Sequence, residues 1–195
     1  MEVSGVVLSG GESSRMGSNK AFIEINGKRI IDRILELMQT LFPEVIVVTN
    51  TPLDYVDLNA RIVTDIVPGK GSLGGIYTGL FYSSYPYSVV VACDMPFLKK
   101  EVIESLLTKR DRYDVVIPHL SDGFHPLHAV YSRRCLTFIE HLIEVDDLKI
   151  IHFFNRIKVR AVKEEEILQL DPKLASFVNI NTPEDLRSME EPVKA

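Results

Sequence analysis

The chain has 195 residues, of which 46% are hydrophobic and 25% are charged, a composition that excludes a disordered or fibrous protein. This length predicts one folded domain over residues 1–188, followed by a frayed tail over 189–195. Lysine and arginine number 22 and aspartate and glutamate 27, so the formal net charge is −5. Because this charge repels nucleic acid and anionic membranes, we expect neither as a partner, and an anionic substrate requires a local basic segment.

The cysteines and the apolar runs indicate the compartment. Cys93 and Cys135 are the only cysteines, and so few in a chain of this length predict reduced thiols. The longest unbroken apolar run, 89–93, is far shorter than the roughly 20 residues of a membrane helix, and Met1-Glu2-Val3 lacks the basic start of a signal peptide. We therefore expect a cytoplasmic protein without a membrane partner.

Strands and helices alternate through the first 110 residues. Short β-branched runs predict buried strands, at 3–8, 45–48, 61–63 and 89–92. Apolar residues at three- and four-residue steps predict helices, at 30–41, 73–82 and 99–110; Phe42-Pro43 ends the first of them. Because alternation requires crossover connections, we expect an α/β fold in three layers, with a mostly parallel sheet and helices on both faces.

The second half of the sequence is less regular. Two strands are predicted at 115–117 and 127–131, joined by a turn at 121–123, and a helix follows with Leu136, Ile139 and Ile143 facing inward. Residues 177–180 predict a short late strand. Thr182 and Pro183 predict the start of a final helix, as N-cap and first helical residue.

A glycine-rich segment, 8–20 (LSGGESSRMGSNK), directly follows the first predicted strand. Gly10 and Gly11 let the backbone approach a ligand closely, and successive N–H groups form an anion-binding nest. Arg15 can bind phosphate oxygens with two hydrogen bonds, and Lys20 adds a mobile positive charge. The segment therefore predicts a phosphate-binding loop, although its spacing is not that of a Walker A motif. The alternative is a surface loop that is merely rich in glycine and serine.

A second glycine segment, 68–75, contains the pattern Gly-x-Gly-x-x-Gly. It follows the third predicted strand and is entered through proline, whereas the dinucleotide fingerprint belongs after the first strand. We therefore expect no NAD site here. Glycines also allow close approach to a base or a phosphate, so we expect this segment to line the same crevice as the first.

Polar side chains follow three of the predicted strands. Asp94 comes after strand 89–92, and Asn50 and Asp65 come after strands 45–48 and 61–63. Since open α/β sheets bind ligands at the carboxyl ends of their strands, we expect the three to converge at one edge. A carboxylate there suits Mg²⁺, which is held by one or two carboxylates together with substrate phosphates and water. The alternative for Asp94 is to cap the helix at 99–110.

Other common signals of catalysis are weak. His125 and His128 have metal-like spacing, but alternation along a strand would place them on opposite faces, so we do not expect a metal there. We expect Cys93 to pack rather than react, because the neighbouring Asp94 raises the pKa of a thiol. No Ser/His/Asp arrangement can be argued from spacing.

The segment 8–20 resembles the Leu-Ala-Gly-Gly-x-Ser-x-Arg-Met-Gly-x-x-Lys signature of the molybdenum cofactor guanylyltransferases. Three further segments are similar to motifs of that family and occur in the same order, at 71–75, 92–97 and 177–186. Serine stands at position 9 where the family has alanine, and at 72 where it has proline. We expect Ser9 to change little, whereas the missing proline leaves the conformation of the second loop open.

The resemblance implies a Rossmann-like, GT-A-type nucleotidyltransferase domain. Such an enzyme transfers GMP from GTP to the terminal phosphate of molybdenum-bearing molybdopterin, with Mg²⁺ and release of pyrophosphate. Transient contact with other molybdenum cofactor enzymes is also implied. Because the attacking phosphate is already an anion at neutral pH, the absence of a poised general base agrees with this chemistry.

The resemblance also implies a role for each matching residue. Catalysis would fall to three residues, two that hold the triphosphate and one that binds Mg²⁺: Arg15, Lys20 and Asp94. Main chain would be presented to guanine by Leu8, Gly10 and Gly11, and further nucleotide contacts would come from Asn50 and Asp65. The pterin side would be lined by Asn179 and Asn181.

Three other functions remain open at this point. A cytidylyltransferase of the same fold would usually read Leu-Ala-Ala-Gly in the first loop, so Gly10-Gly11 favours guanine. A glycosyltransferase would usually carry Asp-x-Asp, whereas this chain has Asp94-Met95-Pro96. A non-catalytic nucleotide-binding regulator would not need both Lys20 and Asp94, the pair that acts at the reacting phosphates.

Overall fold

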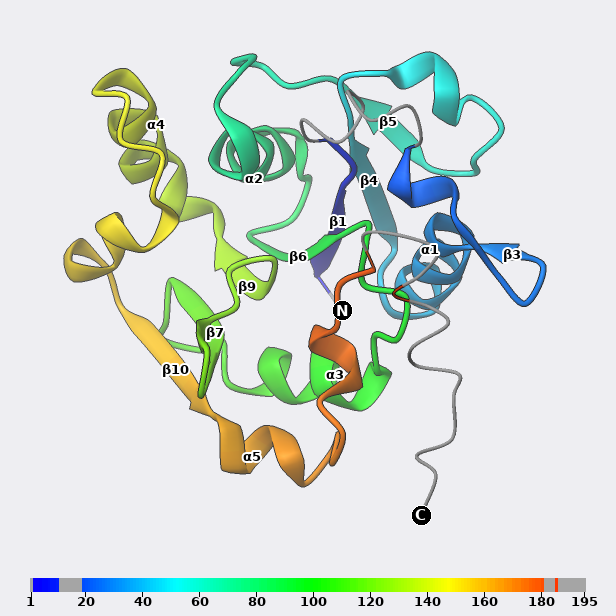
Figure 1. Ribbon diagram of the computed structural model, residues 1–195. Coiled ribbons are helices and arrows are strands. Elements are labelled where there is room, and N and C mark those ends of the chain that lie inside the picture. The colour runs from blue at the N-terminus through cyan, green and yellow to red at the C-terminus, as the bar shows by residue number, and fades with distance from the viewer. Residues whose placement is uncertain (1, 11–18, 181–184, 186–195) are drawn as a thin grey trace.

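The computed structural model describes residues 2–10, 19–180 and 185. Its main sheet has the strand order β10-β7-β9-β6-β1-β4-β5, with β8 paired to β7, and β2 and β3 form a separate hairpin (Figure 1). The strands of the main sheet are β1 (Val3–Leu8), β4 (Glu44–Val48), β5 (Arg61–Val63), β6 (Tyr87–Ala92), β7 (Val115–Leu120), β8 (Gly123–Phe124), β9 (His128–Ser132) and β10 (Val159–Lys163). The hairpin strands are β2 (Glu24–Ile25) and β3 (Lys28–Arg29).

Most strand pairs of the sheet are parallel, as predicted. The central strand β1 runs parallel to β4 and β6, β5 runs parallel to β4, and β10 runs parallel to β7. Strand β9 is antiparallel to both of its neighbours, β6 and β7. Because β9 runs the other way, its first residue, His128, pairs with Val91 near the end of β6. The segment before β9 therefore reaches the edge where the parallel strands end.

Helices cover both faces of the sheet, which confirms the predicted three-layer arrangement. The α-helices are α1 (Ile30–Leu41), α2 (Gly71–Tyr82), α3 (Lys100–Thr108), α4 (Leu136–Glu144) and α5 (Glu164–Leu168). Short 3₁₀ helices are η2 (Lys20–Phe22), η3 (Pro52–Tyr55), η4 (Arg133–Cys135), η5 (Ile150–Arg156) and η6 (Ala175–Phe177). One buried core joins α1 and α3 to the sheet, and a second core joins α2 and α4 to the opposite face.

Helix α2 lies unusually close to the central strand β1. A Cβ atom at Gly79 would lie 2.4 Å from Cγ1 of Val6, so any side chain there would force the helix away from the sheet. The helix begins at Gly71, two positions before the start that the apolar spacing predicts, because glycines at its first turn interrupt that spacing. Nearly all its faces are apolar, as expected for a helix between a sheet and α4.

The predicted strand at 177–180 is wrong. The structure has the 3₁₀ helix η6 followed by an extended stretch to Ile180, without strand pairing. This stretch is attached to the sheet end by one main-chain hydrogen bond, from the Ile180 N–H to the Asp94 carbonyl, at 2.8 Å. The predicted helix start at 182–183 and the tail from 189 lie outside the described residues.

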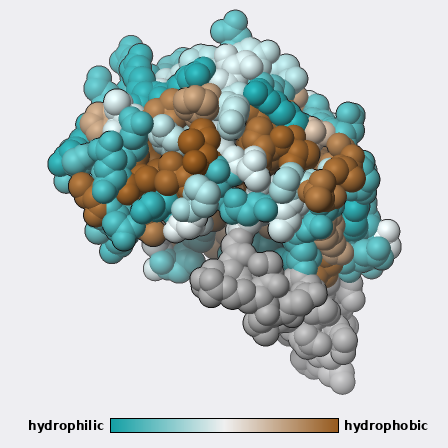
Figure 2. All heavy atoms as spheres, turned by 90° about the horizontal axis from the view of Figure 1, so that it is seen from above, coloured by the Kyte–Doolittle hydropathy of each residue, from teal (hydrophilic) through white to brown (hydrophobic). Residues whose placement is uncertain are grey.

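The surface of the described part includes several exposed apolar side chains. None of its helices has the length and apolar character needed to cross a bilayer. On the face seen in Figure 2, apolar side chains form several groups separated by hydrophilic and neutral ones. Leu53 and Val56, near η3, are the most exposed large apolar residues of those described, at 82% and 75%.

Candidate active site

Four strand ends meet at the carboxyl edge of the sheet. The Leu8 carbonyl accepts a hydrogen bond from the Cys93 N–H at 3.0 Å, and the Ser9 N–H donates to the Val48 carbonyl at 2.8 Å. One strand further out, the Thr49 N–H donates to the Val63 carbonyl at 2.9 Å. These bonds extend the pairing beyond the strands, so the residues that follow β1, β4, β5 and β6 lie along one edge.

Asn50 and Asp65 contact each other at this edge, as the sequence predicts. The Asn50 Nδ2 donates to Asp65 Oδ2 at 2.8 Å. Gly10 lies beside them, because a Cβ atom there would be 3.8 Å from Asn50 Nδ2. Burial raises the pKa of the Asp65 carboxyl, and the bond from Asn50 opposes that shift. The other carboxylate oxygen, Asp65 Oδ1, is buried and has no hydrogen-bond partner among the described residues.

Asp94 lies two residues past the end of β6, next to the charge of Lys20. Burial raises the pKa of its carboxyl, while the positive charge of Lys20 lowers it. Its Oδ1 is buried and lacks a hydrogen-bond partner in the part of the chain that the structure describes. Helix α3 has Lys99 at its N-cap and no side-chain cap, so the alternative of Asp94 as a helix cap is wrong.

The buried Oδ1 atom of Asp94 fits a divalent cation as its partner. A buried polar atom without a partner is costly, and a hard cation is the partner that a carboxylate oxygen accepts best. Within the described ranges, no group of three or more His, Cys, Asp or Glu side chains converges as a metal site. A cation held by Asp94 would therefore need substrate phosphate and water as further ligands, which is how Mg²⁺ is commonly bound.

The two glycine segments touch through Leu8 and Gly75, and the crevice that they are expected to share stays a prediction. Leu8 is buried, and a Cβ atom at Gly75 would lie 3.3 Å from its Cδ1. Three of the predicted site residues, Gly11, Arg15 and Asn181, lie outside the described residues. Their roles stay predictions.

Asn179 is exposed on the stretch that is attached to Asp94 through Ile180. The preceding residues are anchored to the start of α3: the Lys99 Nζ pairs with the buried Asp171 at 2.9 Å. The Ser176 N–H donates to Asp171 Oδ2 at 2.8 Å, and the Lys99 N–H donates to Ser176 Oγ at 3.0 Å. This network holds Asn179 beside the Asp94 loop.

His125 and His128 contact the same ring, Phe177. The His125 and Phe177 ring centroids are 4.9 Å apart, and those of His128 and Phe177 are 4.8 Å apart with the planes tilted by 29°. The expectation that strand alternation separates the two histidines is wrong, because only His128 belongs to β9. His125 precedes the strand and hydrogen-bonds to Asp122 at 2.8 Å.

Burial keeps two nearby groups neutral at physiological pH. It lowers the pKa of His128 to about 4, although the backbone of Ser176 opposes this shift. Neither ring nitrogen makes a hydrogen bond of ordinary geometry with the described residues. Burial also raises the pKa of the Cys93 thiol to about 11, with a further contribution from Asp94. Since the thiolate is the nucleophilic form, Cys93 is a packing residue, as predicted.

One residue that sequence reasoning missed is Tyr55, whose hydroxyl contacts both Ser9 and Asn19. No motif includes it, since it lies in the 3₁₀ helix η3 after β4. The available signal was Ser9 itself: a hydroxyl at the buried end of a strand requires a hydrogen-bond partner. The expectation that Ser9 changes little therefore overlooked a buried contact.

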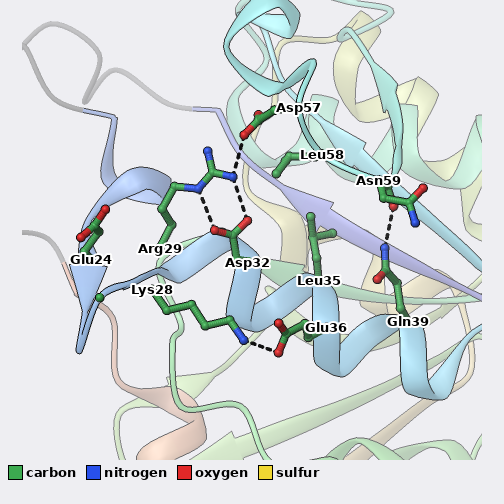
Figure 3. A pocket seen from close by; sticks show the side chains of 11 residues that line it. Glu24, Lys28, Arg29, Asp32, Leu35, Glu36, Gln39, Asp57, Leu58 and Asn59 are labelled. Atoms are coloured by element: carbon green, nitrogen blue, oxygen red, sulfur yellow. Dashed lines mark hydrogen bonds and ion pairs between the residues drawn. The ribbon is translucent and has the colours of Figure 1, made fainter.

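A cavity of about 440 Å³ lies away from the strand ends, between the β2–β3 hairpin, α1 and residues 57–59. Its two basic side chains are already paired: Lys28 with Glu36, and Arg29 with Asp32 and Asp57 (Figure 3). Because their charges are compensated within the cavity, it is a poor place for a phosphate group. The strand edge remains the candidate active site.

Comparison with known proteins decides the family. Residues 5–157 match the MobA-like NTP transferase domain. The molybdenum cofactor guanylyltransferase of Desulfosudis oleivorans is 42% identical over 195 residues, which cover 99% of this chain and 96% of that protein. This chain belongs to the molybdenum cofactor guanylyltransferase family. The guanylyltransferase family assignment and the predicted class of enzyme, a nucleotidyltransferase, are thereby confirmed.

Solved structures agree with this guanylyltransferase fold. The crystal structure of molybdopterin-guanine dinucleotide biosynthesis protein A from Archaeoglobus fulgidus matches with a TM-score of 0.83 and 32% identity, over 96% of each chain. A nucleotidyl transferase from Methanothermobacter thermautotroptrophicus matches with a TM-score of 0.68 and 16% identity, over 96% of this chain and 95% of that one. The second likeness concerns the fold alone.

Proposed function

We propose that the protein transfers GMP from GTP to the terminal phosphate of molybdenum-bearing molybdopterin, releasing pyrophosphate and forming the guanine dinucleotide cofactor. The observation that carries the proposal is the buried Oδ1 of Asp94, which has no hydrogen-bond partner among the described residues and lies beside the charge of Lys20. A carboxylate and an ammonium group adjacent at the end of a central strand suit a cation and the phosphates it binds. Relatives named for guanylyl transfer supply the substrates.

The proposal assigns the nucleotide to the ends of β1, β4 and β5. Guanine would face main chain of Leu8, Gly10 and Gly11. Asn50 and Asp65 would make further nucleotide contacts, supported by their hydrogen bond next to Gly10.

The phosphates and the acceptor would lie near the end of β6, beside Asp94. Arg15 and Lys20 would hold the triphosphate, and Asn179 and Asn181 would face the pterin. The attachment of Ile180 to Asp94 supports this placement, because it brings the acceptor side next to the proposed cation ligand.

The chemistry requires positioning and charge compensation rather than proton abstraction. The attacking phosphate is an anion at neutral pH, so no side chain has to act as a base. Lys20 would offset negative charge on the reacting phosphates, and the half-buried position of Asp94 would limit the weakening of these interactions by water. A divalent cation such as Mg²⁺, when bound by Asp94, would supply further charge neutralisation at the phosphates.

We also propose a single domain over residues 1–188, a cytoplasmic location, and transient contact with enzymes that supply molybdopterin and receive the product. Limited proteolysis of the intact chain tests the domain proposal, since a second domain would give a stable internal fragment. Pull-down with other molybdenum cofactor enzymes tests the contact.

A nucleotide panel tests the assignment of guanine against the second candidate, a cytidylyltransferase. With Mg²⁺, GTP should raise the melting temperature, because a ligand at a hundredfold excess over its Kd stabilises the folded state by about 2.7 kcal/mol. CTP and ATP should not. Equal shifts with CTP would refute guanine selection, and GTP binding without pyrophosphate release in the presence of molybdenum-molybdopterin would indicate a non-catalytic regulator.

A further inference from the structure

The hydroxyl group of Tyr55 joins two segments that flank the glycine-rich loop. Its Oη lies 2.5 Å from Ser9 Oγ and accepts a hydrogen bond from Asn19 Nδ2 at 2.8 Å. Ser9 directly follows β1, and Asn19 directly precedes Lys20. One fully buried side chain therefore contacts both sides of residues 10–18 in the sequence.

Asn19 passes this contact on to the short helix that carries Lys20. Its Oδ1 accepts a hydrogen bond from the Ala21 N–H at 3.1 Å, which caps the 3₁₀ helix η2. A single orientation of the Asn19 amide makes both bonds, since the nitrogen donates to Tyr55 while the oxygen accepts from Ala21. The Tyr55 hydroxyl thus fixes the side chain that caps η2.

The ring of Tyr55 is itself held in place by Phe22, the last residue of η2. Its ring centroid lies 5.0 Å from that of Phe22, and the guanidinium carbon of Arg29 lies 5.4 Å from the Phe22 ring. Arg29 also pairs at 2.8 Å with Asp57, just beyond η3 (Figure 3). These contacts tie η3 to the start of α1, so the hydroxyl has a defined position from which to orient its partners.

The bridge depends on a residue in which this chain departs from the signature that it resembles. Ser9 is 4% exposed, and alanine at this position has no hydroxyl to meet Tyr55. Burial raises the pKa of the Tyr55 phenol, so its proton is retained and either hydroxyl can donate in the bond with Ser9. If Ser9 were alanine, the Tyr55 hydroxyl would keep its hydrogen bond from Asn19 but lose its contact with the end of β1.

We propose that Tyr55 is a positioning residue for nucleotide binding: its hydroxyl fixes the distance between Ser9 and Asn19 and so directs Lys20 toward the phosphates. Tyr55 does not itself touch the substrate. The inference rests on the proposed function, in which the triphosphate binds beside Lys20 and Asp94. It predicts that removing one buried oxygen atom from η3 weakens binding at the strand edge.

The test compares Tyr55→Phe with Tyr87→Phe in the full chain. Each variant loses only a hydroxyl group. The Tyr87 hydroxyl donates to the carbonyls of Arg110 and Tyr113 at 3.3 and 3.2 Å. Tyr87 is the first residue of β6 and therefore lies at the opposite end of that strand from Asp94. In ligand-free protein, amide hydrogen exchange at Ala21 should become about tenfold faster in Tyr55→Phe, and the Kd for GTP should rise about tenfold. Tyr87→Phe should change neither, although both variants lower the melting temperature.

Ser9→Ala offers a second approach, because alanine is the residue of the family signature and should fold. It should weaken GTP binding by a smaller factor, and adding it to Tyr55→Phe should have little further effect, since the shared contact is already lost. Unchanged exchange at Ala21 in Tyr55→Phe would overturn the bridge, and faster exchange with an unchanged Kd would overturn its role in positioning. If the wild-type protein binds no GTP, the proposed function fails, while Ala21 exchange still decides on the bridge.

Discussion

The buried histidine that packs against Phe177 should make the protein sensitive to acid. His128 is fully buried against Phe177, and burial lowers its pKa from 6.5 to about 4. Between these two pH values the unfolded chain binds a proton that the folded chain does not, so stability must fall as the pH falls through this range. At 1.36 kcal/mol for each pKa unit, the loss at pH 4 relative to neutral pH is about 3 kcal/mol.

His128→Leu isolates this effect. Leucine has a similar volume and needs no hydrogen bonds, whereas neither nitrogen of His128 makes a hydrogen bond of ordinary geometry with the described residues. At pH 7 the variant should therefore be at least as stable as the wild-type protein.

Urea unfolding of both proteins at pH 7, 6, 5 and 4 measures the difference in their free energies of unfolding. All other titrating groups are common to the two proteins, so their contributions cancel. The difference should grow in favour of His128→Leu by about 3 kcal/mol on going to pH 4. Parallel pH profiles would refute the reasoning, as would an imidazole signal of His128 that titrates near pH 6.5.

Three further outcomes are expected. Asp94→Asn should leave the melting temperature of the ligand-free protein unchanged or higher, because it removes the charge of a half-buried carboxylate whose Oδ1 has no hydrogen-bond partner among the described residues. Guanylyl transfer at saturating GTP should fall steeply, and excess Mg²⁺ should restore only part of it; near wild-type turnover would show that the cation is held elsewhere, with Asp65 the first residue to examine. Lys20→Ala should lower turnover by about 10²–10³-fold with the fold intact. Unchanged turnover would show that Lys20 is an ordinary surface residue without a catalytic role. Gly79→Ala should lower stability by about 1–3 kcal/mol in thermal unfolding, because the new Cβ would lie 2.4 Å from Val6 Cγ1. This loss should exceed the gain from the better helix propensity of alanine. A melting temperature at or above that of the wild-type protein would show that α2 can move away from β1.

The parallel part of the fold could be predicted because each of its strands and helices is indicated by the residues of one continuous stretch of sequence. The β-branched run of β1 and the apolar spacing of α1 each occupy one stretch of sequence, and Pro43 marks where α1 ends. Asn50 and Asp65 could then be predicted to meet, since parallel strands end at the same edge. Nothing beyond strand type and order was needed for that inference.

The remaining parts of the site depend on contacts between distant segments. Because β9 is antiparallel to β6, the residues before it, including His125, lie at the edge where the parallel strands end. A prediction that assumes parallel strands looks for site residues only after each strand and so misses them. The stretch that ends at Ile180 resembles a strand in composition, yet among the described residues it joins the sheet end through the Ile180–Asp94 hydrogen bond rather than through a ladder of strand pairs. Tyr55 meets Ser9 through tertiary packing alone, without periodicity or a motif.

The short outer strand β5 bears on how the protein behaves at high concentration. Its three residues are the last on one side of the main sheet, so few backbone groups are left for a strand of another molecule to pair with. The guanidinium of Arg61 is bound to the Tyr82 carbonyl at 3.0 Å and lies 3.5 Å from Glu44, which places a charged group at that border. A short border strand that carries charge discourages growth of the sheet from one molecule to the next, so this side of the protein should resist edge-to-edge aggregation.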